Sequence, residues 1–242
     1  MKMSKILAAA GVIALAAAVY VAISKVYPFN WNLVVRYYIL FMKGLLITLK
    51  VSVVSLVISF FLGLIFALFR RSHFEFLQDL GSIYVWFFRN TPLLVIILLT
   101  YYGVGTIFQM NRFWASVIAL SLFEGAYMTE ILRSGMEAVD KGEIEAARSL
   151  GMSEFQIFTA VVFPQAIRIS LPPLIGQMVS LIKDSSLASV IALEELTMMG
   201  RQVGTRTLAS FESYLIVAIL YVTITSIISF SGRIIERRLS LP

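Results

Sequence analysis

Cysteine is absent from this chain of 242 residues, and histidine occurs once, at His73. The missing cysteines exclude disulfides, thiolate metal sites and cysteine nucleophiles. The sequence also lacks a G-x-x-x-x-G-K-[ST] phosphate-binding loop, a nucleophile elbow, an H-E-x-x-H motif and any cluster of metal ligands. We therefore expect a chain without catalytic residues, a bound metal or a cofactor of its own, and His73 is expected to be a solvated loop residue.

Charge is scarce as well. Charged residues make up 14% of the chain and hydrophobic residues 59%, whereas a soluble domain is roughly 25% charged. About 20 apolar residues cross the bilayer core as a helix. We expect an all-α, polytopic membrane protein with six spans, in Ile6–Ile23, Val51–Phe69, Leu80–Met110, Phe113–Leu132, Ile169–Leu193 and Ser213–Gly232.

The first of these runs has a basic head, which is also typical of a signal peptide. No clear small-x-small cleavage site precedes Lys25, so we expect a retained span. The aromatic segment Tyr27–Lys43 that follows is expected to lie at the outer membrane surface. Residues 1–43 are thus one unit, and residues 44–242 are the main transmembrane domain. Glu194–Glu212 is expected to be an outer polar loop.

The positions of Lys and Arg set the expected orientation. Positive charge favours cytoplasmic loops. With the N-terminus inside, Arg70-Arg71, Lys141, Arg148 and Arg237-Arg238 all lie in the cytoplasm. The net charge of +6 is spread over short loops, which indicates membrane orientation rather than nucleic-acid binding. We expect both termini to be cytoplasmic.

Two spans carry informative patterns. Small residues recur at steps of three and four in the second span, which predicts a stripe for close helix packing: Ser52, Ser55, Ser59, Gly63 and Ala67. The third span is interrupted by Arg89-Asn90-Thr91-Pro92. The interruption is either a broken helix lining a wet cavity or the cytoplasmic entrance of a span Thr91–Met110, and the second interpretation is favoured slightly.

Ionisable residues inside spans usually face a bundle interior or an aqueous path. Glu130, Arg133 and Glu137 share one helix face, which predicts a structural charge ladder. Glu124 has no local partner and is the better functional candidate. Lys183-Asp184-Ser185-Ser186 is the strongest polar signal within a span, either as a substrate site or as polar contacts between helices.

Residues 142–164, GEIEAARSLGMSEFQIFTAVVFP, are the longest polar interruption. Acids in its first turn favour a short helix over Glu143–Leu150, and Gly151 suits a left-handed C-terminal cap. Ser153 and Gln156 form a capping box that starts a second helix, with an apolar run that ends at Pro164. The pattern predicts a helix, a glycine corner and a helix between two spans.

This stretch resembles the EAA loop of ABC importer permeases. Glu145-Ala146-Ala147 is followed by Gly151 and, after an apolar run, by Pro164, although Phe163 stands where the family usually has Leu. The resemblance runs from about Gly44 to the C-terminus and includes YVWFFRNTPLLV, EGAYMTEILRSGMEAVDKGEIEAARSLGM, FPQAIRISLPPLIGQMVSLIKDSSLASVI and the closing ERR. These segments are similar to the polar amino-acid branch, the histidine-, glutamine-, glutamate- and arginine-type permeases.

The resemblance implies a five-span core, with Ile6–Ile23 as an extra span, in a bacterial inner membrane. Two such permeases, identical or different, would pair and bind two ATPase subunits, which hold ATP and magnesium, through a coupling loop at about 140–164. An extracytoplasmic binding protein would deliver an amino acid. The implied ATPase contacts are Glu143, Glu145, Ala146, Ala147, Arg148 and Gly151.

Depth and chemistry favour Asp184 as the partner of an ammonium or a cationic side chain. The other residues expected along the substrate pathway are Ser185, Ser186, Leu187, Thr91, Glu124 and Lys183. Two alternatives stay open. An ion-coupled secondary transporter would use Glu124 and Asp184 as an ion relay, but no inverted repeat is visible in the sequence. A purely structural membrane scaffold would need no coupling loop.

Overall fold

The computed structural model describes residues 11, 14 and 17–239, and every regular element among them is helical. The predicted all-α class is confirmed. Residues 17–24 are helical. The named helices are α2 (Trp31–Val35), α3 (Tyr38–Phe69), α4 (Glu75–Asn90), α5 (Leu93–Leu99), η1 (Thr100–Val104), α6 (Gly105–Ile107), α7 (Arg112–Glu137), α8 (Lys141–Ser149), α9 (Glu154–Ile157), η2 (Phe158–Val162), α10 (Phe163–Asp184), η3 (Ser185–Ile191), α11 (Leu196–Thr207) and α12 (Ser210–Leu239).

Four stretches of helix are long and apolar enough to cross a membrane: Tyr38–Phe69, Arg112–Glu137, Glu154–Ile191 and Ser210–Glu236. Helix α4 and the helical stretch Leu93–Ile107, which comprises α5, η1 and α6, form a fifth candidate span that is bent by 106°. These five match the predicted five-span core. Half of the predicted first span, Ile6–Ile23, lies outside the described residues.

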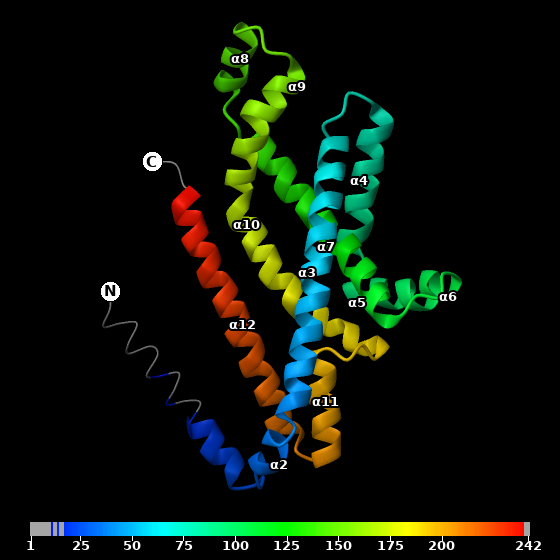
Figure 1. Ribbon diagram of the computed structural model, residues 1–242, viewed down its shortest axis with the longest axis vertical. Helices are drawn as coiled ribbons and strands as arrows, with labels where there is room; N and C mark the ends of the chain where they lie inside the picture. Colours follow the sequence, from blue (N-terminus) through cyan, green and yellow to red (C-terminus); the bar gives the residue numbers. More distant parts are fainter. Residues whose placement is uncertain (1–10, 12–13, 15–16, 240–242) are drawn as a thin grey trace.

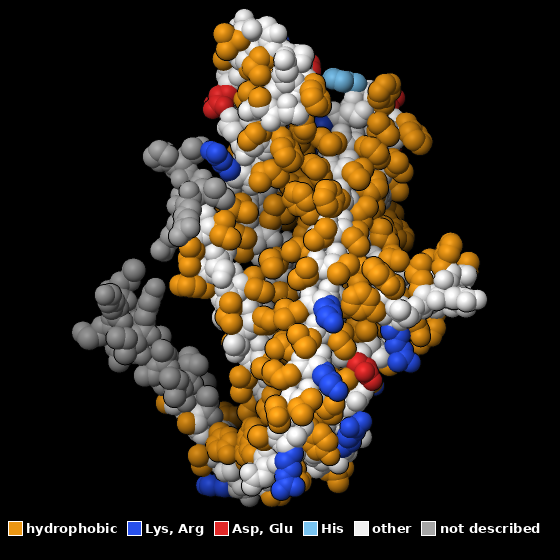
Figure 2. Space-filling view, viewed as in Figure 1, with side chains coloured by type: hydrophobic (Ala, Val, Ile, Leu, Met, Phe, Trp, Pro, Cys, Tyr) orange, Lys and Arg blue, Asp and Glu red, His pale blue; other side chains and the backbone are white. Residues whose placement is uncertain are grey.

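The spans lie along the long axis of the molecule, with short helices at both ends (Figure 1). Helices α8 and α9 project at the top of the view, and α2 and α11 lie at the bottom. Hydrophobic side chains cover most of the visible face between these ends, and lysines and arginines gather toward the lower one (Figure 2). An apolar belt between polar ends suits a protein whose middle faces lipid.

Helices α3 and α7 form the most extensive helix pair. The predicted small-residue stripe is its seam, and all of its members are buried: Ser52, Ser55, Ser59, Gly63 and Ala67. A Cβ atom at Gly63 would meet Met128 of α7 at 2.6 Å, so a larger residue would push the two helices apart. The packing role predicted for the stripe is therefore confirmed.

The third span is a broken helix. Thr91 and Pro92 separate α4 from α5, and the two helices meet at 106°. The favoured interpretation, a span from Thr91 to Met110 with Arg89-Asn90 at its entrance, is wrong. Proline lacks a backbone donor and disfavours helical geometry in the residue before it; Thr91 is accordingly extended, at φ −104° and ψ 131°.

Three boundaries also differ from expectation. Helix α3 begins at Tyr38, so the end of the predicted interfacial segment Tyr27–Lys43 belongs to a span. The predicted loop Glu194–Glu212 contains α11, whose N-cap Glu195 accepts bonds from the amides of Thr197 (2.9 Å) and Met198 (2.7 Å). Helix also continues through Pro164, because proline is tolerated in the first turn of α10 after the π-helical turn η2.

Candidate functional site

The first candidate site is the corner between α8 and α9. Helix α8 begins two residues earlier than predicted, because the Asp140 side chain caps it by accepting from the Gly142 amide at 2.6 Å. Gly151 adopts φ +79° directly after the helix, as the predicted C-terminal cap requires. The amides of Gly151 and Met152 then bond to the carbonyls of Arg148 (3.0 Å) and Ala147 (3.2 Å). These bonds fix the angle at which the chain leaves α8.

The predicted capping box is present at the start of α9. Ser153 Oγ accepts from the Gln156 amide at 3.3 Å, and Gln156 Oε1 accepts from the Ser153 amide at 2.8 Å. The two ends of the corner are therefore capped by residues of the corner itself. The predicted helix, glycine corner and helix are confirmed as local structure.

The residues expected to contact an ATPase fall into two groups. Glu145 and Ala146 are exposed, whereas Ala147 is buried against the inner side of the corner. Glu143 accepts a bond from Gln165, and Arg148 pairs with Glu154 at 2.8 Å, so these two side chains have partners within the chain. Two large apolar side chains that the sequence reasoning missed, Leu150 and Phe155, are 83% and 75% exposed. The signal was an apolar residue on each side of Gly151 in an otherwise polar loop.

The second candidate site lies inside the bundle around Glu124 of α7. Glu124 is fully buried, its Oε2 accepts a bond from Gln177 of α10, and its Oε1 has no partner among the described residues. Asp184 lies close enough for the two carboxyl groups to interact. Sequence reasoning selected Glu124 and Asp184 but missed Gln177, an amide within the apolar half of α10. A buried acceptor without a donor fits a bound cation or a proton.

Lys183 and Asp184 lie on different sides of α10, as their adjacency predicts. Lys183 and Ser186 line a cavity of about 330 Å³ with Tyr214 and Tyr221 of α12, whereas Asp184 faces Glu124. Two other residues predicted for the pathway, Ser185 and Leu187, differ in their exposure. Ser185 is buried and donates to the Ile182 carbonyl at 2.7 Å, and Leu187 is 36% exposed. The structure therefore brings together Glu124 and Asp184 and leaves Lys183 on another side.

Thr91 lies at the break between α4 and α5. Its hydroxyl donates to the Phe87 carbonyl at 2.8 Å, and the Asn90 side-chain amide donates to the Trp86 carbonyl at 2.7 Å. Both side chains thus bond back to the last turn of α4. The hydroxyl predicted for substrate contact is thus already used as a donor within the chain.

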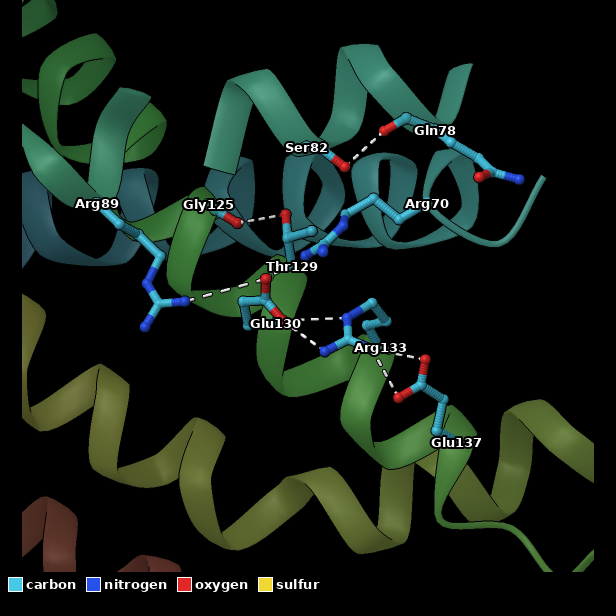
Figure 3. A network of polar contacts seen from close by, with 9 residues as sticks. All are labelled: Arg70, Gln78, Ser82, Arg89, Gly125, Thr129, Glu130, Arg133 and Glu137. Atoms are coloured by element: carbon cyan, nitrogen blue, oxygen red, sulfur yellow. Dashed lines mark hydrogen bonds and ion pairs between the residues drawn. The ribbon is translucent and has the colours of Figure 1, made fainter. Parts of the chain in front are cut away.

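The predicted ladder on α7 is part of a larger charge network (Figure 3). Arg133 contacts Glu130 at 2.9 Å and Glu137 at 2.6 Å, as the helix spacing predicts. Glu130 also pairs closely with Arg70 at the end of α3 and lies 3.9 Å from Arg89 at the end of α4. Sequence reasoning missed these last two contacts, because they join residues far apart in the chain.

Comparison with known proteins identifies the family. Residues 59–241 match the model of the binding-protein-dependent transport system inner membrane component, and the chain belongs to that family. It is a multi-pass permease subunit of the ABC transporter type in an inner membrane, and its family is not itself catalytic.

Relatives and solved structures show which members of this family the chain is similar to. The chain is 35% identical to the arginine transport system permease protein ArtQ of Bacillus subtilis, over 82% of this chain and 91% of the relative. It is 39% identical to the probable glutamine ABC transporter permease protein GlnP of the same organism, over 81% and 91%. A crystal structure of an amino acid ABC transporter with histidines superposes with a TM-score of 0.81 at 37% identity, covering 88% of this chain and 100% of that one. An inward-facing MetNI methionine ABC transporter, at 21% identity and a TM-score of 0.75, supports the fold alone.

Proposed function

We propose that this chain forms one of two paired permease subunits of an ATP-driven amino-acid importer. The sequence match to permeases named for arginine and glutamine supports an amino acid as the substrate. The partners are two ATPase subunits, which hold ATP and magnesium, an identical or sister permease, and an extracytoplasmic binding protein. Both termini lie in the cytoplasm, so that α8 and α9 project there.

The observation that carries this proposal is the exposed surface at the α8–α9 corner. Glu145, Ala146, Leu150 and Phe155 are all exposed there, on a helix pair whose own backbone is capped internally. Small Ala146 permits close approach, the two apolar side chains would be buried in a partner, and Glu145 offers a charge for a basic side chain. Such a corner would transmit closure of the ATPases to α7 and α10, since α8 and α9 connect these spans.

Substrate would pass the Glu124–Gln177–Asp184 cluster. A carboxyl pair in a shielded site binds an ammonium or a cationic side chain well, because the cation reduces the repulsion between the two acids. The weaker candidates along the same pathway are Lys183, Ser185, Ser186, Leu187 and Thr91. Two variants compare the acidic cluster with a weaker candidate. We expect loss of uptake for D184A and a small effect on uptake for T91V.

The test is uptake in proteoliposomes that contain the chain with its ATPase and binding protein. We expect uptake of a labelled amino acid to require ATP, to persist when ionophores collapse ion gradients, and to fall about tenfold or more in E145K. An exposed acid outside the corner, in E75K, serves as the matched control and should leave uptake unchanged. Uptake driven by an ion gradient without ATP would instead identify a secondary transporter.

A further inference from the structure

The guanidinium of Arg89 has an unusual position for a charged group. Arg89 lies in the last turn of α4, just before the 106° break, and at 1.5 Å per residue it lies about 21 Å along the helix from Glu75. A charge at the centre of a transmembrane helix costs about 2.5–3.5 kcal/mol on insertion scales, so arginines at membrane depth face the bundle or a water-filled cavity. Arg89 therefore belongs to a hydrated region of the protein.

Arg89 is also the least satisfied cation of the charge network. Arg70 and Arg133 contact the two oxygens of Glu130 closely, and Arg133 also holds Glu137. Arg89 reaches Glu130 only at 3.9 Å, which is too long for a hydrogen bond, and its side chain is 43% exposed. The described network thus contains three arginines and two glutamates, and the excess positive charge falls on Arg89.

A polar cavity of about 430 Å³ opens beside this guanidinium, which is large enough for a small organic ligand. It is lined by Arg70, Ser82, Val85, Trp86, Arg89, Asn90, Tyr127 and Glu130. The ring of Tyr127 lies 5.2 Å from the guanidinium carbon of Arg89 and holds it in place from one face. The planar fork of donors remains available at its edge, and such a fork matches a carboxylate in two parallel bonds.

Helix α7 carries residues of both the cavity and the Glu124 cluster. Tyr127 follows Glu124 by three residues on α7, which places it about one turn closer to the end that continues into α8. Thr91, within the break, is two residues from Arg89. Tyr127, which contacts Arg89, thus stands one turn of α7 from the acidic Glu124. An amino acid carries groups of both signs.

We infer that Arg89 binds the carboxylate of the transported amino acid on the cytoplasmic side of the Glu124–Asp184 cluster. The inference rests on the proposed function and adds a binding residue to it. Every α-amino acid has this carboxylate, so Arg89 would recognise the common part of the substrate, whereas the acidic cluster would recognise its cationic part. Transfer of the carboxylate to Arg89 would draw the substrate toward the cytoplasm.

The experiment measures binding to the purified permease–ATPase complex in lipid nanodiscs without the binding protein. The probes are labelled arginine and glutamine and, as competitors, their primary amides, which lack the carboxylate charge. We expect wild type to bind the free acid about tenfold or more tightly than the amide, and R89Q to lose this preference by weaker binding of the acid alone. R89K, which keeps the charge but not the fork, should be intermediate. The matched control R168Q removes an exposed arginine of α10 that does not line the cavity and should behave as wild type.

Several results would overturn the inference. One is an unchanged preference for acid over amide in folded, monodisperse R89Q. Another is the absence of saturable binding in wild type while ATP-driven uptake proceeds, which would leave the proposed function intact. If R89Q changed only the retention of phosphatidylglycerol from the nanodisc, the cavity would be a phosphate headgroup site instead. Failure of uptake for every amino acid tested would contradict the proposed function as well.

Discussion

The α8–α9 corner and the Glu130 network use the same kinds of side chain in opposite ways. In the corner, the pair Arg148–Glu154 is 57% and 76% exposed and closes a local turn. In the network, Arg70, Glu130 and Arg133 are 23–25% exposed and tie the ends of separate helices. An exposed pair contributes little to stability and can exchange partners, whereas a shielded pair holds its helices together because a lost partner leaves a charge without compensation. The corner is therefore suited to docking a partner, whereas the Glu130 network stabilises the packing of the helix bundle.

The largest expected effect comes from neutralising the same residue type in both regions. E130Q would leave Arg70, Arg89 and Arg133 close together without the carboxylate that neutralises them, and we expect a loss of about 3 kcal/mol in the free energy of unfolding. E154Q removes an exposed partner and should cost less than about 1 kcal/mol. Thermal unfolding in detergent measures both. Equal losses in the two variants would show that the shielding of the network has no energetic consequence.

The second effect concerns the glycine that sets the corner. Gly151 has φ +79°, where a Cβ atom costs about 1–2 kcal/mol, although nothing within 4 Å would obstruct it. We expect G151A to reorient α8 and to lose most ATP-driven uptake while ATP hydrolysis by the partner continues and the spans melt near the wild-type temperature. G176A in α10, which also has free space but no left-handed backbone, is the control and should transport normally. Full uptake by G151A would show that the angle of the corner does not matter.

The two regions also differ in how far the sequence predicts them. The corner is encoded locally: Ser153, Gln156 and Gly151 each act within a few residues, so their pattern predicted the capping box and the left-handed cap. The network depends on tertiary placement. The spacing on α7 predicted that Arg133 meets Glu130, but no sequence pattern relates Arg70 or Arg89 to Glu130 across 60 and 41 positions of the chain. The same limit explains why Gln177 was missed, since its partner Glu124 lies 53 positions away. The break at Pro92 is local and was visible in the sequence, but its interpretation as a span entrance was wrong.

The smallest expected effect tests whether the corner is held by its own caps. S153A removes the side-chain acceptor of the Gln156 amide, and a lost N-cap costs about 1 kcal/mol. Because α9 is short and the loss is local, the melting temperature of the spans should hardly change, while hydrogen exchange at Gln156 accelerates about fivefold. S149A is the matched control, since the Ser149 hydroxyl donates only to the Glu145 carbonyl within α8 at 3.0 Å and its loss leaves no amide without a partner. Equal acceleration at Gln156 in S149A would mean that the corner responds as one unit. In that case the geometry of the corner would depend on packing against Ile157 and Ala147 rather than on the cap. The corner and the Glu130 network would then differ only in how exposed their charged side chains are.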